Sequence, residues 1–375
     1  MEKKIEILHI TRSMQDRADR LTEEAVEISD RRKMITQLSN LALQLYSWYI
    51  KNGHARNEED ETDVKSFFKN NLPKDALTFD GFYERLYLYQ SYCWFAFIRQ
   101  DFLMYYRYTQ KWVNLFQENK VMIEVEMGHY IKGMHNLLNA HFDLRNYKQF
   151  DTTLLQFEKF ALSDPARQHD TFRIQTFIYI HSAKINRHFM VGTFKEGLTL
   201  VPEIEKQLEQ YALFIDDHRI MVIRYKIATL YFGSGDYDTS IDYLQKIINN
   251  SAELRTDLQC YARLLHLMAH YELGNYSIID YLIRSVYRYM AKMQNLTVIE
   301  EEIFRFLRNS FALSRHQLKP ELEHFLMKIK KLEKSRFETR SFAYLDVISW
   351  VESKIFRKTM GAIIHEKYML SKRVS

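Results

Sequence analysis

The stretch IATLYFGSGDYDTSIDYLQKIIN, residues 227–249, decides the fold. A helix-like run ends in Gly233-Ser234-Gly235, an Asp-Tyr pair follows, and a second helix-like run begins. Phosphate-binding loops need either G-x-G-x-x-G or G-x-x-x-x-G-K-[ST] directly after a strand. Here the glycines follow a helix, Asp238 replaces the third glycine, and no Lys-Ser/Thr pair follows. We therefore predict the turn of a helical hairpin, in which both glycines are used because they tolerate positive φ.

The composition of the chain indicates a nearly all-helical protein. Only 10 Gly and 4 Pro occur in 375 residues, whereas average usage is roughly 7% and 5%. β-Sandwiches and Rossmann-type folds need many Gly/Pro turns, and this chain cannot supply them. Hydrophobic residues make up 46% and charged residues 27%, which excludes a disordered chain. The length suits two domains or one elongated array.

Cysteine usage and hydropathy indicate where the protein acts. Cys93 and Cys260 both lie in apolar helical runs, which excludes a disulfide framework and a CxxC zinc site. The N-terminus has no apolar signal core, and no run of about 18 uncharged apolar residues exists. We therefore expect a cytoplasmic protein without a membrane span. Of the net charge of +5, the excess lies in Arg315–Ser375, with 14 Lys+Arg against 7 Asp+Glu.

The junction around Gly235 recurs along the chain. The aromatic residues that end these junctions are separated by 45, 47, 43 and 39 residues. Two helices of about 20 residues plus their turns fill one such period, so each period predicts one helical hairpin. Stacked hairpins of this kind form a solenoid. The junctions are FIRQDF (97–102), FDLRNY (142–147), FMVGTF (189–194), FGSGDY (232–237) and YELGNY (271–276).

The quoted stretch resembles a tetratricopeptide repeat (TPR). That family places a small residue and a Tyr three positions apart late in the first helix, then a Gly-Asp/Asn-Tyr turn, then a small residue in the second helix. The corresponding slots here hold Ala228, Tyr231, Gly235-Asp236-Tyr237 and Ser240.

The other repeats match the TPR pattern less well. The small slot holds Phe150 in the second repeat and Tyr105 in the first, and the usual Pro at the repeat end is missing. The periods exceed the family length of about 34 residues. The array therefore resembles a divergent TPR array with lengthened helices, and it is similar to uncharacterised bacterial TPR-like proteins.

The predicted fold is all-α: a right-handed superhelix, or α-solenoid, of TPR-like hairpins. We expect residues 1–80 to form an N-terminal helical segment with an acidic linker, NEEDETD, at 57–63. Within this segment, 13–51 is predicted as one long helix, and 52–80 as a loop with a short helix around 64–70. The repeat array, about five hairpins, should cover 81–296. Residues 297–375, which are net basic, should form helices that cap the last repeat.

The sequence contains no motif that predicts catalysis, a cofactor or a metal. His266 and His270 are one turn apart, but Leu267 stands where an HExxH motif needs glutamate, and no third ligand is evident. His141 and His188 fall in the slot that Tyr231 holds, where a ring with a polar edge can replace tyrosine. We therefore expect a protein that is not an enzyme, although an enzyme with an unrecognised site is a third alternative to the functions considered below.

The TPR resemblance implies a peptide-binding groove. In TPR arrays the first helix of each hairpin lines the concave face. Aromatic rings with interleaved amides, Lys and His suit an extended peptide, because amides hold backbone groups and rings supply contact area. Asn139 and Asn186 share one slot, as in family members whose asparagines hold a peptide backbone. The candidate groove residues are Tyr87, Gln90, Trp94, Lys132, His135, Asn139, Tyr179, Asn186 and Tyr225.

The expected function is a non-catalytic scaffold that binds a protein or peptide partner. The first alternative is a regulator of a second protein that responds to a peptide. Another is nucleic-acid binding through the basic segment KIKKLEKSRFETR (328–340). Acidic residues interrupt this segment at Glu333 and Glu338, which is typical of a solvated capping helix. Nucleic acid is therefore not the expected partner.

Overall fold

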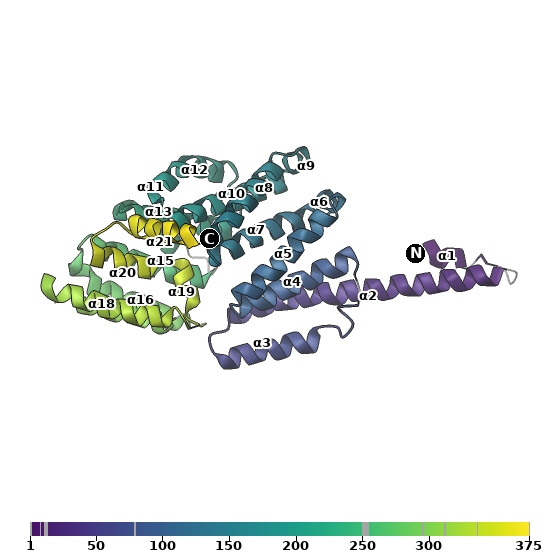
Figure 1. Cartoon of the computed structure of the whole chain (residues 1–375), viewed down its shortest axis with the longest axis horizontal. Helices are drawn as coiled ribbons and strands as arrows, with labels where there is room; N and C mark the ends of the chain where they lie inside the picture. Colours follow the sequence, from purple (N-terminus) through teal and green to yellow (C-terminus); the bar gives the residue numbers. More distant parts are fainter. Residues whose placement is uncertain are drawn as a thin grey trace. The chain divides into compact units, whose positions relative to one another are not determined.

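The computed structural model describes residues 2–7, 9–10, 14–78, 80–249, 255–294, 296–310, 313–335 and 337–374. All regular elements in these residues are helical, and they include no strand, which confirms the predicted all-α class (Figure 1). The chain divides into two compact units, Met1–Val125 and Glu126–Ser375, called unit 1 and unit 2 below. The boundaries that we predicted for the repeat array, at 80/81 and 296/297, are not the boundary between these units, and they remain predictions.

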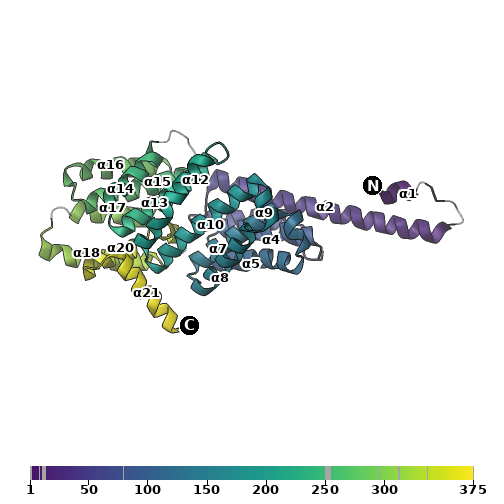
Figure 2. The ribbon, with the colours of Figure 1, turned by 90° about the horizontal axis from the view of Figure 1, so that it is seen from above.

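Unit 1 is organised around one long helix. This helix, α2, covers Gln15–Asn52, in agreement with the helix predicted for 13–51. Its C-terminal half shares a hydrophobic core with two other helices, α3 and α4, and α1 lies beside its N-terminal half (Figure 2). The helices of unit 1 are α1 (Glu2–Ile7), α2, α3 (Glu58–Asn71), α4 (Phe82–Ile98), α5 (Phe102–Glu118) and α6 (Val121–Val125).

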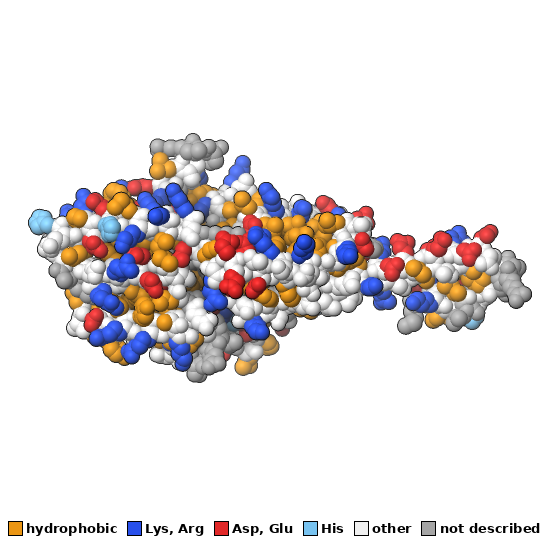
Figure 3. Space-filling view, turned by 90° about the horizontal axis from the view of Figure 1, so that it is seen from below, with side chains coloured by type: hydrophobic (Ala, Val, Ile, Leu, Met, Phe, Trp, Pro, Cys, Tyr) orange, Lys and Arg blue, Asp and Glu red, His pale blue; other side chains and the backbone are white. Residues whose placement is uncertain are grey.

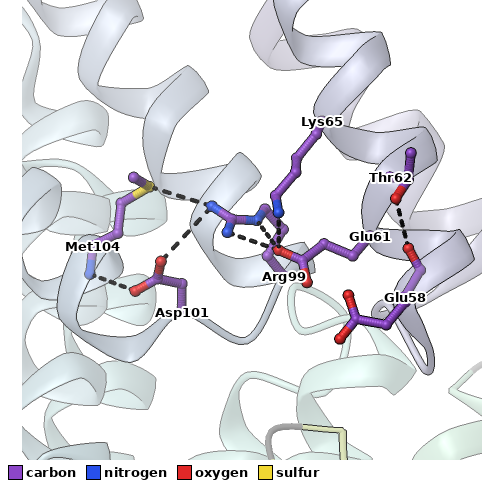
Figure 4. Close-up of polar contacts among 7 residues, drawn as sticks. All are labelled: Glu58, Glu61, Thr62, Lys65, Arg99, Asp101 and Met104. Atoms are coloured by element: carbon purple, nitrogen blue, oxygen red, sulfur yellow. Dashed lines mark hydrogen bonds and ion pairs between the residues drawn. The ribbon is translucent and has the colours of Figure 1, made fainter.

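The acidic run predicted as a linker is instead the start of α3. The Asn57 side chain caps this helix by accepting a hydrogen bond from the backbone N–H of Asp60 at 2.8 Å. Acidic residues in a first turn are stabilised by the helix dipole. Glu61 is buried and lies 2.8 Å from both Arg99 of the α4–α5 turn and Lys65 (Figure 4). The short helix predicted around 64–70 thus begins earlier, at Glu58, because the cap, the helix dipole and the Glu61 ion pairs stabilise the acidic run as helix.

Unit 2 consists of helices that pack in sequential pairs. The first helices of successive hairpins pack on one another in chain order: α7 packs on α10, α10 on α13, and α13 on α15. The second half of the third repeat is broken into α11, a 3₁₀ turn and α12, which begins at Val201-Pro202. The helices are α7 (Met127–Asp143), α8 (Tyr147–Ala161), α9 (Asp164–Gln168), α10 (Asp170–Val191), α11 (Phe194–Gly197), α12 (Val201–Gln210), α13 (Asp217–Ser234), α14 (Tyr237–Ile248), α15 (Thr256–Glu272), α16 (Tyr276–Lys292), α17 (Val298–Ser310), α18 (Arg315–Leu332), α19 (Thr339–Tyr344), α20 (Val347–Phe356) and α21 (Met360–Val374).

The GSGD stretch is the turn between α13 and α14, as predicted. Gly235 ends α13 in the left-handed conformation with φ of +91°, and Asp236 caps α14. The reason predicted for Gly233 is wrong, because this residue is helical. A Cβ atom at Gly233 would lie 2.3 Å from the Phe194 ring, so close packing between hairpins requires this glycine.

Three hairpin turns share one aromatic contact. In each, the turn aromatic meets the aromatic residue five positions earlier, at the end of the preceding helix. In the fourth repeat, the small residue Ser240 is fully buried and donates a hydrogen bond to the carbonyl of Ala228 at 2.9 Å. The aromatic pairs and their ring-centroid distances are Phe189–Phe194, 6.0 Å; Phe232–Tyr237, 5.3 Å; and Tyr271–Tyr276, 6.2 Å.

The C-terminal helices contact helices that lie both near and far from them in the chain. α17 packs on α16, and α18 and α20 follow, but α21 returns to α10 and α13. Gly192 and Gly361 allow this approach, since a Cβ at Gly192 would lie 2.3 Å from the carbonyl oxygen of Gly361. The His365 imidazole lies 3.1 Å from the carbonyl oxygen of Val191. The C-terminal segment therefore contacts both early and late helices of unit 2.

Candidate functional site

The three candidate groove residues of unit 1 lie on α4, on the side that faces α2. All three are half-buried. The Trp94 ring packs against Tyr46 and Tyr49 of α2, with centroid distances of 5.0 and 5.7 Å. Tyr87 packs against a second cluster that joins α2 to α4. These rings contribute to the packing of α4 on α2.

In unit 2, the structure brings the candidate residues of α7 and α10 together. The His135 ring stacks on Tyr179, with centroids 3.9 Å apart and an interplanar angle of 12°. The Lys132 ammonium lies 5.7 Å from the centre of the same tyrosine ring. The Asn139 amide is 3.1 Å from the His135 imidazole. Four of the nine predicted residues thus form one continuous group.

The groove residues of α10 and α13 are joined by a contact that the sequence reasoning missed. The side-chain oxygen of the buried Asn186 accepts a hydrogen bond from Lys226 of α13. Lys226 follows the predicted Tyr225 and lies four residues after Val222, which the repeat pattern also predicts as a groove position. Residues four apart share a helix face, so this spacing could have identified Lys226.

The electrostatics of this group follow from its burial. Burial, together with the nearby Lys132, Lys226 and Arg219, holds the pKa of His135 well below its usual value. Burial lowers the pKa of Lys226 to about 8, although Asp143 opposes the shift. At neutral pH the group therefore presents a neutral imidazole, amides and an ammonium that is partly desolvated. These groups can donate hydrogen bonds to carbonyl or carboxylate oxygens.

Tyr225 is covered by the chain's own C-terminal segment. Its hydroxyl donates a hydrogen bond to the carbonyl of Tyr344 at 3.1 Å. The Tyr344 ring stacks on Tyr261 of α15, with centroids 4.2 Å apart. The Tyr344 hydroxyl donates to Asp257 at 2.8 Å and accepts from Arg255 at 2.9 Å. Tyr344 therefore packs against both α13 and α15.

A second set of contacts holds the same C-terminal segment to α15 and α17. The Ser341 hydroxyl donates to the buried Glu300 and lies 3.2 Å from the Tyr261 hydroxyl. The Glu338 carboxylate accepts a hydrogen bond from the backbone N–H of Ile299 at 3.1 Å. Burial raises the pKa of Glu300, while its hydrogen bonds from Ser341 and Thr297 act in the opposite direction.

The four histidines considered in the sequence analysis are buried or half-buried. His266 and His270 contact each other with ring centroids 4.5 Å apart, and burial lowers the pKa of His266 to about 4. Across the described part of the chain, no group of three or more His, Cys, Asp or Glu residues could hold a metal ion. His141 is buried, and His188 lies 2.8 Å from the Thr193 hydroxyl.

The basic segment 328–340 already has acidic partners. The Lys328 ammonium is 3.1 Å from Glu302, and that of Lys330 is 2.7 Å from Glu352. Glu352 also pairs with Lys367 of α21 at 2.7 Å. At least these two lysines of the segment act in the packing of the C-terminal helices.

Comparison with known proteins adds no relatives. No protein-family model matches the chain, and no curated protein matches its sequence. Within the described residues, none of the helices combines the length and the apolar character that crossing a bilayer requires.

Proposed function

We propose that unit 2 is a TPR-like superhelix that binds an extended peptide segment of a partner protein on α7, α10 and α13. One observation carries this proposal: slots predicted from the repeat pattern meet across successive helices. His135 stacks on Tyr179 between α7 and α10. Between α10 and α13, the predicted Asn186 accepts a hydrogen bond from Lys226, which was not itself predicted. We also propose that the protein is a scaffold without catalytic activity and that it acts in the cytoplasm.

The chemistry of these side chains suits a peptide backbone. Asn139, Asn186 and Lys226 supply hydrogen-bond donors, and the rings of His135 and Tyr179 supply contact area at low entropic cost. An extended peptide would form hydrogen bonds with the amides of Asn139 and Asn186 in place of their present contacts with His135 and Lys226. The peptide carbonyls would thereby find donors that the side chains are already positioned to offer.

The test is affinity capture from the native cell lysate with identification by mass spectrometry. Wild type is compared with the double variant Asn139→Ala/Asn186→Ala and with the control Gln168→Ala/Asn249→Ala, whose residues are exposed in the same unit. We expect the first variant to lose at least 90% of a partner that wild type and control both retain, which is about a tenfold loss of affinity. Equal capture by all three proteins, at equal melting temperature, would contradict the proposal.

The covering of Tyr225 favours a second candidate function, a regulator that responds to a peptide. A ligand that reached Tyr225 would have to displace Tyr344, and displacement would release the contacts of Tyr344 with Arg255, Asp257 and Tyr261. Binding at Tyr225 would in this way change the surface that Tyr344 and its neighbours present to a second protein. The captured partner should then bind the variant Tyr344→Ala more tightly than wild type. Equal or weaker binding would argue against this regulator.

A further inference from the structure

A basic and aromatic patch lies on the solvent-facing side of α16 and the adjoining α17. The buried side of α16 carries Ile279, Ile283 and Val286, and the patch residues repeat at spacings of three and four on the opposite side. Exposed fractions of 63% for Tyr281 and 40% for Tyr287 show that both rings are open to solvent. The α16 patch, as we call it, lines an open hollow of about 490 Å³ and consists of Tyr281, Arg284, Tyr287, Arg288 and Arg308.

The three guanidinium groups of the α16 patch are mostly not neutralised. Arg284 pairs with Asp280 at 3.1 Å, but both side chains are more than half exposed, so this pair is weak. Arg288 donates to the backbone carbonyl of Arg284 at 3.2 Å. Within the described residues, neither Arg288 nor Arg308 has a carboxylate partner. In the view of Figure 3, Lys and Arg side chains lie near the lower left edge, with hydrophobic side chains among them.

We propose that the α16 patch binds single-stranded nucleic acid. Guanidinium groups hold phosphates with well-directed hydrogen bonds, and exposed tyrosine rings are platforms on which unpaired bases stack. Arg284 and Arg288 are one helical turn, or about 5.4 Å, apart along α16, and Tyr281 and Tyr287 line the same hollow as these two residues. The patch thus alternates the two groups that a single strand requires.

Other anionic partners fit the α16 patch less well. An acidic peptide would pair with the guanidinium groups of Arg284, Arg288 and Arg308, but it would place carboxylates rather than flat rings against Tyr281 and Tyr287. Duplex DNA offers phosphates, but its bases are not free to stack on side chains. The lysines of segment 328–340 are weaker candidates for phosphate binding, because Lys328 and Lys330 have carboxylate partners. The α16 patch lies on other helices than the proposed peptide site, and the proposal for the patch does not depend on peptide binding.

The test is fluorescence anisotropy of the full chain with a labelled oligothymidylate or oligouridylate of about 12 nucleotides at about 50 mM salt. The variant Arg284→Ala/Arg288→Ala/Arg308→Ala should bind at least tenfold more weakly than wild type. Its slope of log affinity against log salt should be shallower by about 2, because three phosphate contacts are lost. Tyr281→Ala should weaken binding about tenfold and leave the salt slope unchanged.

A matched control separates a defined site from general charge attraction. Lys148→Ala/Arg167→Ala/Lys206→Ala removes three exposed cations from the same unit and should change affinity less than twofold. A tenfold loss in this control would overturn the proposal, as would wild-type protein that does not bind the oligonucleotide. Equal competition by poly-glutamate or by duplex DNA would also overturn it, since either would show that base stacking is not used.

Discussion

The first helix of the first hairpin, α4, and the corresponding helices α7 and α10 carry the same repeat slots but have different neighbours. On α4, Trp94 packs against two tyrosines of α2. On α7, His135 stacks on Tyr179 of the next first helix, α10. In unit 1 the slot side is covered by a helix outside the repeat pattern, whereas in unit 2 the slots meet each other.

This difference shows what a repeat slot determines. The slot fixes the side of the helix on which a residue lies, because it follows from helical periodicity. The neighbouring element decides whether that side is core or binding surface. α2 has 38 residues and lays aromatic side chains over α4, so Trp94 contributes to stability. In unit 2, by contrast, His135 and Asn139 are half-buried and contact Tyr179 of α10 and each other, and we propose binding there.

The largest expected effect comes from removing the Trp94 side chain. Trp94→Ala should lower the free energy of unfolding by about 2–3 kcal/mol, less than for a fully buried tryptophan because the ring is half-buried. Lys132→Ala, at a slot of α7, should change it by less than about 0.5 kcal/mol. Urea denaturation followed by circular dichroism measures both. If both variants changed the free energy of unfolding by the same small amount, the proposed difference between α4 and α7 would be wrong, because packing of Trp94 would then contribute no more than that of Lys132.

The next effect concerns the slot that Tyr231 holds in the fourth repeat, which His141 holds on α7 and the buried Ala96 on α4. Burial lowers the pKa of His141 to about 4, whereas an unfolded chain has a histidine pKa near 6.5. The unfolded state therefore takes up the proton first as pH falls. The contribution of neutral His141 to the free energy of unfolding is therefore complete above about pH 6.5. It is lost as the pH falls from about 6.5 to about 4, and it does not change further below that pH.

His141→Tyr removes this titration and keeps a ring in the slot. We expect the loss of stability between pH 6.5 and 4 to be smaller in this variant by about 2 kcal/mol, within the limit that the pKa shift sets. Urea titrations at several pH values measure the difference. The control His316→Tyr, at an exposed position of α18, should leave the pH profile unchanged. If His141→Tyr kept the wild-type profile, His141 would not be a protonation-sensitive part of unit 2.

The hairpins were predictable because their signals are local and repeated. Gly235 ends one helix and the next residue, Asp236, caps the following helix. Both residue types are recognisable in the sequence as helix-end signals. The group on α7 and α10 was predictable to the same extent, since a shared slot places residues on corresponding sides. The stacking of His135 on Tyr179 itself depends on how closely the two helices approach, which no local pattern states.

Contacts between distant residues were not predictable from these patterns. Tyr225 and Tyr344 are 119 positions apart, and Tyr344 lies in a segment where the repeat signal has faded. The role of Gly233 depends on Phe194 of the preceding hairpin, 39 positions earlier. The sequence therefore predicted C-terminal helices that follow the repeats, but it did not show that the C-terminal segment contacts Tyr225 of α13.

The acidic run in unit 1 combines a local and a distant signal, and it yields the smallest effect. Asn57→Ala removes the hydrogen bond that caps α3 and should cost about 1 kcal/mol of unfolding free energy. Asn57→Ser should restore most of this stability, because serine is also a good cap. Urea denaturation of the three proteins measures the differences. If Asn57→Ala were neutral, the distant pairing of Glu61 with Arg99, and not the local cap, would be what makes this run a helix.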